Sequence, residues 1–429
     1  MKKKFLVFAL IMTLALIGLN TRSGRAGEAD ILVNKLVEKK ILTQDEAAQM
    51  ITDMLKEGPR QNEEIKTLVA ESAKEEAKNN KQVLPSWVQN MTLSGDIRVR
   101  YQTEDVNNDT NPRRDRWRIR LRTGVTSRIN DQWGAAFGLA TGGGTDGTDP
   151  ISRNQTLTDE FQAPGARIDY VYIKYTPVKD MTFMAGKIKN PLWITKDMIW
   201  DHDAMPDGLG GNLNFKASDS ITFFVNPGYF VLKEIKETTK DPAMLAIQPG
   251  MNWKISDSLN FKVAGAYYNF INVQGTDMSV HSDGGNSRDA VNKWLYKMNS
   301  TAFDAELGLK MSNFLKNISV FGEYVKSDAD ADNTGWDAGI KLGESVSEKG
   351  QWQLVYNYRN LEKDAWVDWL PDSDFMGGAT GVKGSEFEFS CGLNKNVSFG
   401  LDYYMNNQPI DNPTDKKQNL LQVDLLVKF

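Results

Sequence analysis

The chain has 429 residues, of which 25% are charged and 40% hydrophobic, so it is neither a disordered chain nor a bundle of membrane helices. The net charge of -5 argues against a general nucleic-acid-binding protein. One cysteine and two histidines exclude a disulfide framework or a cysteine zinc site, and they leave little for other metal or acid–base chemistry.

The N-terminal segment has the parts of a secretory signal peptide. Lys2, Lys3 and Lys4 precede an apolar run of about fifteen residues, which is too short to cross a bilayer comfortably. Gly24 and Ala26 are the small residues that a cleavage site requires. We therefore predict that residues 1–26 are removed on export. Because no cysteine follows, we expect no lipoprotein anchor.

Residues 27–85 carry helical patterns. Thr43 and Glu46 form a T-x-x-E capping box ahead of an apolar periodic stretch, which Gly58 and Pro59 end. A further stretch, residues 61–80, is highly charged. We predict a helical or coiled-coil periplasmic segment. It is either a charged spacer or trimerising stalk, or a module that binds peptidoglycan or a partner.

From residue 86 onward, apolar and polar residues alternate to the C terminus. Alternation with a period of two predicts strands that have one apolar and one polar face. About sixteen such segments can be counted. They are expected to begin near residues 91, 114, 131, 167, 180, 211, 219, 244, 257, 300, 314, 334, 349, 385, 396 and 417.

The connections between these segments alternate in length. Tight turns are expected at residues 128–131, 177–180, 218–220, 256–258 and 394–396, and long polar loops near residues 142–166, 190–210, 228–243, 271–299 and 363–384. An even number of strands with short turns at one end and long loops at the other is typical of an outer-membrane barrel. We therefore predict an all-β fold, a transmembrane antiparallel β-barrel over residues 86–429.

Two further features fit this fold. Aromatic residues at the expected strand ends suit the interfacial girdles of a membrane barrel: Tyr101, Trp117, Trp133, Tyr175 and Trp352. The terminal Phe429, preceded by Val427, Leu425 and Val423, resembles the C-terminal signal that the barrel-assembly machinery recognises. That machinery is therefore an expected partner.

Several motifs in the barrel region occur together in one known family. The most specific stretch, residues 186–211, contains Gly186-Lys187, Asn190-Pro191, Trp200-Asp201-His202-Asp203 and Gly208. The arginine-rich segment near residue 118 and the loop with Ser152, Asn154, Gln155 and Thr156 are also similar. With these motifs, residues 86–429 resemble the putative porin family of Gram-negative outer membranes. The resemblance implies a sixteen-stranded diffusion pore that is often trimeric, and it does not name a solute.

Six arginines are the strongest candidates for pore-lining residues. The period of two places them on the polar face of two neighbouring antiparallel strands, where they would form one basic ladder: Arg98, Arg100, Arg116, Arg118, Arg120 and Arg122. In a water-filled pore such an arginine ladder would attract anions. The alternative is a solvated wall whose charges pair locally with residues such as Asp96 and Asp115.

The loop near residues 190–210 supplies candidates for a constriction: Lys187, Trp200, Asp201, Asp203 and Asp207. The resemblance favours a loop that folds into the lumen. Alternatively, the loop caps the barrel from outside or stabilises a neighbouring subunit.

Other motifs fail their context tests. Asp328, Asp330 and Asp332 begin like a calcium loop, but the expected glycine and final glutamate are missing. The glycines of residues 142–147 match G-x-G-x-x-G, but no helix follows them. We expect no enzyme, no cofactor and no metal site.

The sequence therefore predicts an outer-membrane porin for passive diffusion of small hydrophilic solutes or ions. Its expected surroundings are outer-membrane lipid and lipopolysaccharide, and it is expected to be a homotrimer. The main alternative is a barrel that acts as a scaffold or sheath for a secreted or periplasmic protein. A weaker one is a soluble carbohydrate-binding β-protein.

Overall fold

The computed structural model describes residues 85–429 apart from residues 107–112, 143–148, 279–284, 313 and 413–416, together with residues 37, 39, 41, 43, 45–47 and 49. The chain separates into two units, Met1–Pro85 and Ser86–Phe429. The predicted signal peptide and most of the predicted helical segment lie outside the described residues. Within the described residues, no helix is long and apolar enough to span a membrane.

The described part of the first unit contains the predicted capping box. The main-chain N–H of Thr43 donates to Glu46 Oε2 over 2.8 Å, and the N–H of Glu46 donates to Thr43 Oγ1 over 3.3 Å. Residues 45–47 are helical. These reciprocal bonds satisfy main-chain donors that a helix start otherwise leaves without partners.

The second unit begins with a short helix, α5 (Ser86–Gln89), and is otherwise built of strands. The strands are β1 (Met91–Val106), β2 (Arg114–Arg128), β3 (Trp133–Ala140), β4 (Gln155–Thr156), β5 (Arg167–Val178), β6 (Met181–Lys187), β7 (Asp207–Lys216), β8 (Ile221–Val231), β9 (Ala243–Lys254), β10 (Leu259–Ile271), β11 (Ser300–Lys310), β12 (Asn317–Ser327), β13 (Thr334–Gly343), β14 (Trp352–Leu361), β15 (Val382–Asn394), β16 (Val397–Pro409) and β17 (Gln418–Lys428). Two 3-10 turns lie in loops, at Asp159–Phe161 and Met376–Gly378.

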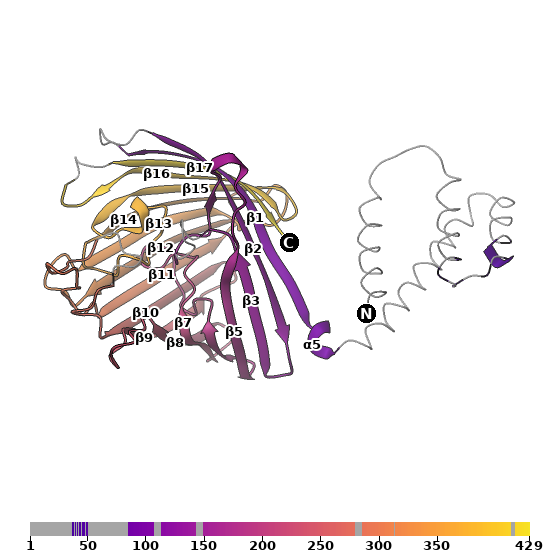
Figure 1. Cartoon of the computed structure of the whole chain (residues 1–429), viewed down its shortest axis with the longest axis horizontal. Coiled ribbons are helices and arrows are strands. Elements are labelled where there is room, and N and C mark those ends of the chain that lie inside the picture. The colour runs from indigo at the N-terminus through magenta and orange to yellow at the C-terminus, as the bar shows by residue number, and fades with distance from the viewer. Residues whose placement is uncertain are drawn as a thin grey trace. The chain divides into compact units, whose positions relative to one another are not determined.

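The described strands close into a barrel. Apart from the two-residue β4, which adds to β2, each strand pairs antiparallel with its neighbours in the chain, and β17 pairs with β1. Gly95 and Phe429 exchange main-chain hydrogen bonds of 2.9 and 3.0 Å where the barrel closes. Figure 1 shows the strands side by side, with β17 next to β1. The predicted sixteen-stranded antiparallel barrel is confirmed, and each predicted strand start lies within four residues of the observed one.

The outer face of the barrel is apolar. On β1 and β2 the exposed positions include Leu93, Ile97, Trp117 and Leu121, and large exposed hydrophobic residues recur on most of the other strands. Aromatic pairs lie near both ends of the strands: ring centroids are 4.5 Å apart in Trp133–Tyr175 and 5.3 Å apart in Tyr101–Trp117. A closed barrel leaves no open strand edge, so such a surface suits hydrocarbon.

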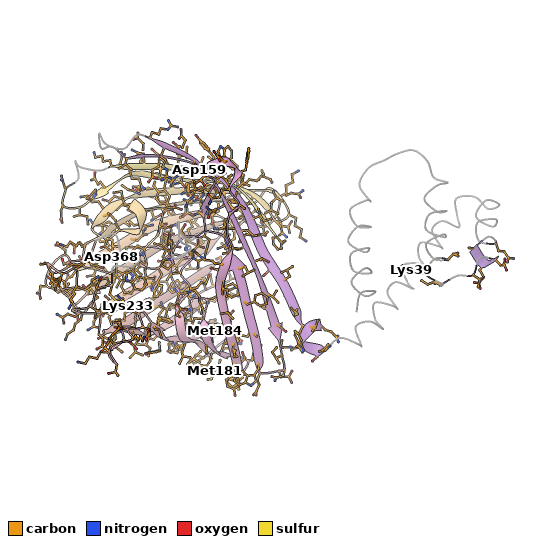
Figure 2. All side chains as sticks on the ribbon, viewed as in Figure 1. Lys39, Asp159, Met181, Met184, Lys233 and Asp368 are labelled. Carbon is orange, nitrogen blue, oxygen red and sulfur yellow. The ribbon has the colours of Figure 1, made fainter. Side chains whose placement is uncertain are left out.

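The inner face is not uniformly polar. Figure 2 draws the described side chains on the ribbon, and many of those inside the barrel form one buried apolar cluster. Its members are Ile151, Ile188, Leu192, Met198, Ile199, Trp200, Ala204, Phe230, Met244, Ala246, Ala266, Tyr268, Phe270, Val273, Met278, Trp294, Met298, Ala302, Val325, Leu361, Ala365, Trp366, Val367 and Leu370. The inward faces of β8 to β12 are therefore mixed, because Gln248, Asp304 and Glu323 lie beside the inward residues of this cluster, and the prediction of a wholly polar inner face is wrong there. Their inward positions pack against loops that fold back into the barrel.

Candidate functional site

The six arginines of the ladder come from β1 and β2, where the register makes them neighbours. Arg98 lies opposite Arg120, and Arg100 lies opposite Arg118. The residues between them on both strands, such as Val99 and Trp117, are exposed on the apolar outer face. Because side chains alternate along a strand, the arginines point into the barrel.

Each arginine of the ladder lies within ion-pair distance of a carboxylate. The closest N–O distances are 3.4 Å for Arg98–Asp424, 2.7 Å for Arg100–Asp424, 2.7 Å for Arg116–Glu104, 3.8 Å for Arg118–Asp374, 2.9 Å for Arg120–Asp96 and 2.7 Å for Arg122–Asp96. Asp96 is thus the local partner that the alternative interpretation named. Asp115 pairs with Arg113 instead, over 3.2 Å. The ladder is a row of paired guanidinium groups.

The β6–β7 loop, residues 188–206, crosses the interior. The N–H of Trp193 donates to Gln248 on β9 over 2.8 Å, and the N–H of Thr195 donates to Asp304 on β11 over 3.3 Å. Lys196 reaches Glu386 on β15 over 3.2 Å. Contacts with three separated strands require the loop to lie inside the barrel.

Two paired glycines lie where this loop leaves and rejoins the wall. Gly186 on β6 and Gly208 on β7 are cross-strand partners, with φ values of 129° and 139°. Residues with a Cβ rarely adopt such angles. These glycines belong to the motif that carried the family resemblance, and they allow both strands to bend at the base of the loop.

The structure separates the five constriction candidates into two groups. Trp200 is only 2% exposed and belongs to the apolar cluster. Asp203 pairs with Arg122 over 3.1 Å, and Asp201 accepts the N–H of Ser373 over 3.0 Å, so both face inward. Lys187 and Asp207 pair with each other over 3.1 Å at the base of the loop and are partly exposed. They pair with none of the other three, although they line one cavity of about 390 Å³ together with Trp200.

A second long loop, the β14–β15 loop of residues 362–381, also folds inward. Trp366 is fully buried in the apolar cluster, and Asp374 pairs with Arg100 over 3.0 Å. The alternation pattern predicts a long polar loop near residues 363–384, whereas the structure packs much of it into the barrel. The signal for its inward position was present, because Trp366, Val367, Trp369 and Leu370 are too apolar for a solvated loop.

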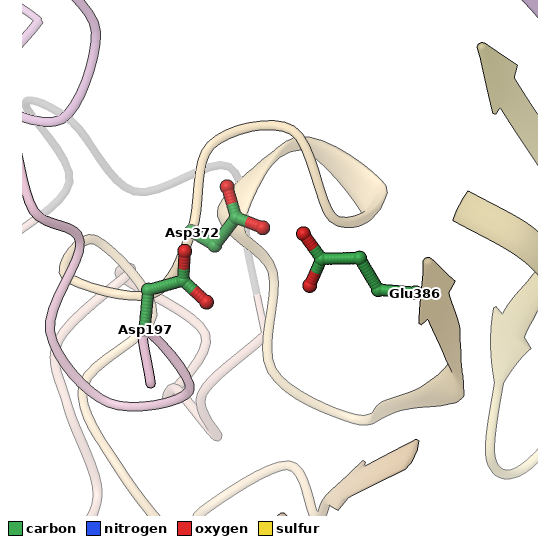
Figure 3. Close-up of side chains that lie close together, drawn as sticks. All are labelled: Asp197, Asp372 and Glu386. Atoms are coloured by element: carbon green, nitrogen blue, oxygen red, sulfur yellow. The ribbon is translucent and has the colours of Figure 1, made fainter. Parts of the chain in front are cut away.

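Arg359 of β14 joins the two inward loops. Its Nη2 lies 3.0 Å from Asp197 of the β6–β7 loop, 3.5 Å from Asp372 of the β14–β15 loop and 3.3 Å from Glu386 of β15. The three carboxylates point toward one another, as Figure 3 shows, and their nearest oxygens lie within 4.8 Å. Lys196 adds a second cation, 3.4 Å from Asp197. The set resembles a metal site in spacing, but two side-chain cations already compensate its charge.

Two of these carboxylates, Asp197 and Asp372, come from loops, and their pKa values are shifted in opposite directions. Burial tends to raise the pKa of both groups. For Asp197 the neighbouring Lys196, together with His202 and Arg359, outweighs burial and holds the pKa well below its usual range. For Asp372 burial and the charge of Asp197 together raise the pKa. A proton on Asp372 would relieve the crowding of negative charge.

Comparison with known proteins identifies a matching family. A family model described as "Putative porin" matches residues 51–113, 105–303 and 296–429. No curated protein matches the sequence. Among solved structures, a triple mutant of Rhodopseudomonas blastica porin is 9% identical, with a TM-score of 0.44, and a loop-deletion form of OmpT, an outer membrane protein of Vibrio cholerae, is 10% identical, with a TM-score of 0.43. Each covers 79% of this chain and 100% of its own.

Proposed function

The chain belongs to the putative porin family, and from that premise we propose that it is an outer-membrane porin through which small hydrophilic solutes or ions diffuse passively. The observation that supports this most is the charged side of the barrel interior. The paired charges of β1, β2 and β15 to β17 surround a cavity of about 150 Å³, whose lining includes Arg98, Arg120, Glu388, Asp402 and Asp424. Charged groups in such numbers favour contact with water.

In this proposal the arginine ladder and the two inward loops determine which solutes pass. Asp201 and Asp203 place acidic groups across from the ladder, and Trp200 anchors their loop. Because each arginine of the ladder is paired with a carboxylate, the wall of the lumen carries strong local electric fields but little net charge. We therefore expect weak rather than strict ion selectivity. Passage needs no cofactor, energy source or catalytic group.

Export, assembly and quaternary structure are parts of the same proposal. The signal peptide directs export, Phe429 is read by the barrel-assembly machinery, and the apolar outer face sits among outer-membrane lipid and lipopolysaccharide. A homotrimer remains our expectation from the family. Analytical ultracentrifugation of the detergent-solubilised protein tests it, because a monomeric sedimentation mass would contradict the trimer.

The test of the pore itself is electrical. Purified, refolded protein is added to a planar bilayer, and conductance and reversal potential are recorded under a potassium chloride gradient. Discrete, stable conductance steps are expected. Their absence, from protein whose gel mobility shifts on heating as a folded barrel's does, would contradict the porin.

One observation favours the alternative scaffold function. The apolar cluster occupies part of the interior with side chains from four loops, and a filled barrel conducts poorly. A scaffold or sheath would then bind a secreted or periplasmic partner and conduct few ions. Folded barrels that give no conductance steps would favour this function over the porin.

A further inference from the structure

A carboxylate from the β14–β15 loop lies against the centre of the arginine ladder. Asp374 Oδ2 accepts a hydrogen bond from Arg100 Nη1 over 3.0 Å, and Asp374 Oδ1 lies 3.8 Å from Arg118 Nη1. Arg100 and Arg118 are direct cross-strand neighbours. A single loop carboxylate therefore contacts both strands of the ladder.

Like Asp203, which pairs with Arg122 from the β6–β7 loop, Asp374 differs from the strand acids of the ladder in where it comes from. Asp96, Asp402 and Asp424 are strand residues, so they lie within the barrel wall beside the arginines. Asp374 approaches from the loop, on the lumen side. Its side chain is 17% exposed, whereas that of Arg100 is 3% exposed. A passing ion would therefore meet Asp374 before it met Arg100.

The loop is held in this position on both sides of Asp374. Before it, Asp372 accepts a hydrogen bond from Tyr404 Oη over 3.1 Å, and the N–H of Ser373 donates to Asp201 over 3.0 Å. After it, the N–H of Met376 donates to Gln418 over 2.9 Å. Because Asp201 belongs to the β6–β7 loop, the two inward loops fix each other.

We propose that Asp374 is a specificity-determining residue of the pore, which masks the middle of the arginine ladder and so lowers its preference for anions. This inference rests on the proposed porin function. A unit charge beside a narrow aqueous path changes the local concentration of ions of both signs. With Asp374 in place, Arg100 and Arg118 offer little net field to an anion. Without it, Arg118 would lose its ion-pair partner and Arg100 would keep only Asp424 and Asp402, so this part of the ladder would carry more net positive charge.

The first test is Asp374→Asn in the full chain, recorded in planar bilayers under a potassium chloride gradient. At about 6 Å and in water, loss of one unit charge should change the local concentration of each ion about threefold, in opposite directions for chloride and potassium, and so raise the permeability of chloride relative to potassium about tenfold. Asp374→Glu keeps the charge and should keep the reversal potential of the unmodified protein. Asp330→Asn is the matched control, because Asp330 is exposed in the β12–β13 loop.

A second test changes the charge after the barrel has folded. The sole cysteine, Cys391, is first replaced in Cys391→Ser, and Asp374→Cys is then introduced. In the open channel a thiol reagent that carries a sulfonate should restore the original reversal potential. One that carries a quaternary ammonium should shift it further toward chloride. Because the charge at position 374 is changed only after folding, the effects of a negative and of a positive charge are compared in channels that folded in the same way.

The outcomes separate this inference from the porin function. A chloride shift in Asp374→Asn, with opposite shifts from the two reagents, supports the masking role. If the channels open but their reversal potential is the same after all of these changes, the masking role is wrong and the porin function still stands. If the unmodified, folded barrel gives no conductance, the porin function fails, and the masking role fails with it.

Discussion

Two regions of the barrel interior are built from the same kind of alternating strand, yet they carry different side chains. Over β8 to β12, inward residues such as Phe230, Tyr268 and Phe270 pack with loop tryptophans in a buried apolar cluster. Over β1, β2 and β15 to β17, inward positions carry Arg100, Asp402 and their charged neighbours.

This difference in side chains indicates that the two regions have different roles. Apolar packing excludes water and fixes the loops, as the core of a soluble domain does. Paired charges need hydrogen-bonding partners or water, so they line the part of the interior that solutes could use. The β6–β7 and β14–β15 loops belong to both regions: Trp200 and Trp366 lie in the apolar cluster, while Asp203 and Asp374 face the ladder.

The largest effect is expected where the two regions meet. Arg359→Gln leaves Asp197, Asp372 and Glu386 close together with less compensating charge, and breaking such a buried pair typically costs about 3–5 kcal/mol. The measurement is urea unfolding of the detergent-solubilised barrel. Arg113→Gln, in an exposed pair, is the control and should change little. Equal effects of the two changes would mean that Arg359 does not join the loops.

A slightly smaller loss is expected from the apolar region. Ile199→Ala removes a side chain that is 1% exposed in the β6–β7 loop, and it should lower the free energy of unfolding by about 2–5 kcal/mol. Ile247→Ala makes the same change on the outer face, at 49% exposure, and should cost less. If the outer change proved the more damaging, the apolar cluster would not stabilise the barrel.

In the charged region, the expected effect is on ion preference. Arg118→Ala and Arg120→Ala each remove one cation from beside a carboxylate, so each should raise the permeability of potassium relative to chloride about tenfold at about 6 Å in water. Reversal potentials under a salt gradient measure this shift. Arg128→Ala, at the exposed end of β2, provides the control. If neither change altered the reversal potential, the porin function would stand, but the arginine ladder would have only a structural role.

The smallest effect is expected at the base of the β6–β7 loop. Lys187 and Asp207 form a partly exposed pair, and such pairs contribute about 0–1 kcal/mol. Lys187→Met combined with Asp207→Asn should therefore leave both the unfolding midpoint and the reversal potential nearly unchanged. A clear change in reversal potential would instead support the original prediction that Lys187 and Asp207 belong to the constriction.

Much of the fold was predictable because its signals are local. Alternation from residue 91 to the C terminus identifies the strands, and turn residues between them give their order. Alternation also assigned Arg98 to Arg122 to the inward face, since a strand residue's side is fixed by its neighbours in the chain. The Thr43–Glu46 capping box is local in the same sense.

The candidate site was less predictable, because its contacts join residues that are far apart in the chain. Asp374 meets Arg100 across 274 positions, and Lys196 meets Glu386 across 190. No spacing in the sequence encodes such a pair. The apolar residues of the β14–β15 loop were the one sequence signal that this loop folds inward.

The sequence by itself therefore determined the number of strands, their antiparallel order and the side of the wall on which the six ladder arginines lie. The tertiary structure decided which loops enter the lumen and which carboxylate faces which arginine. The physical reason is that strand alternation is set by local backbone geometry. Loop position depends on closure of the barrel, which brings β17 beside β1 and makes one enclosed space from residues spread along the chain.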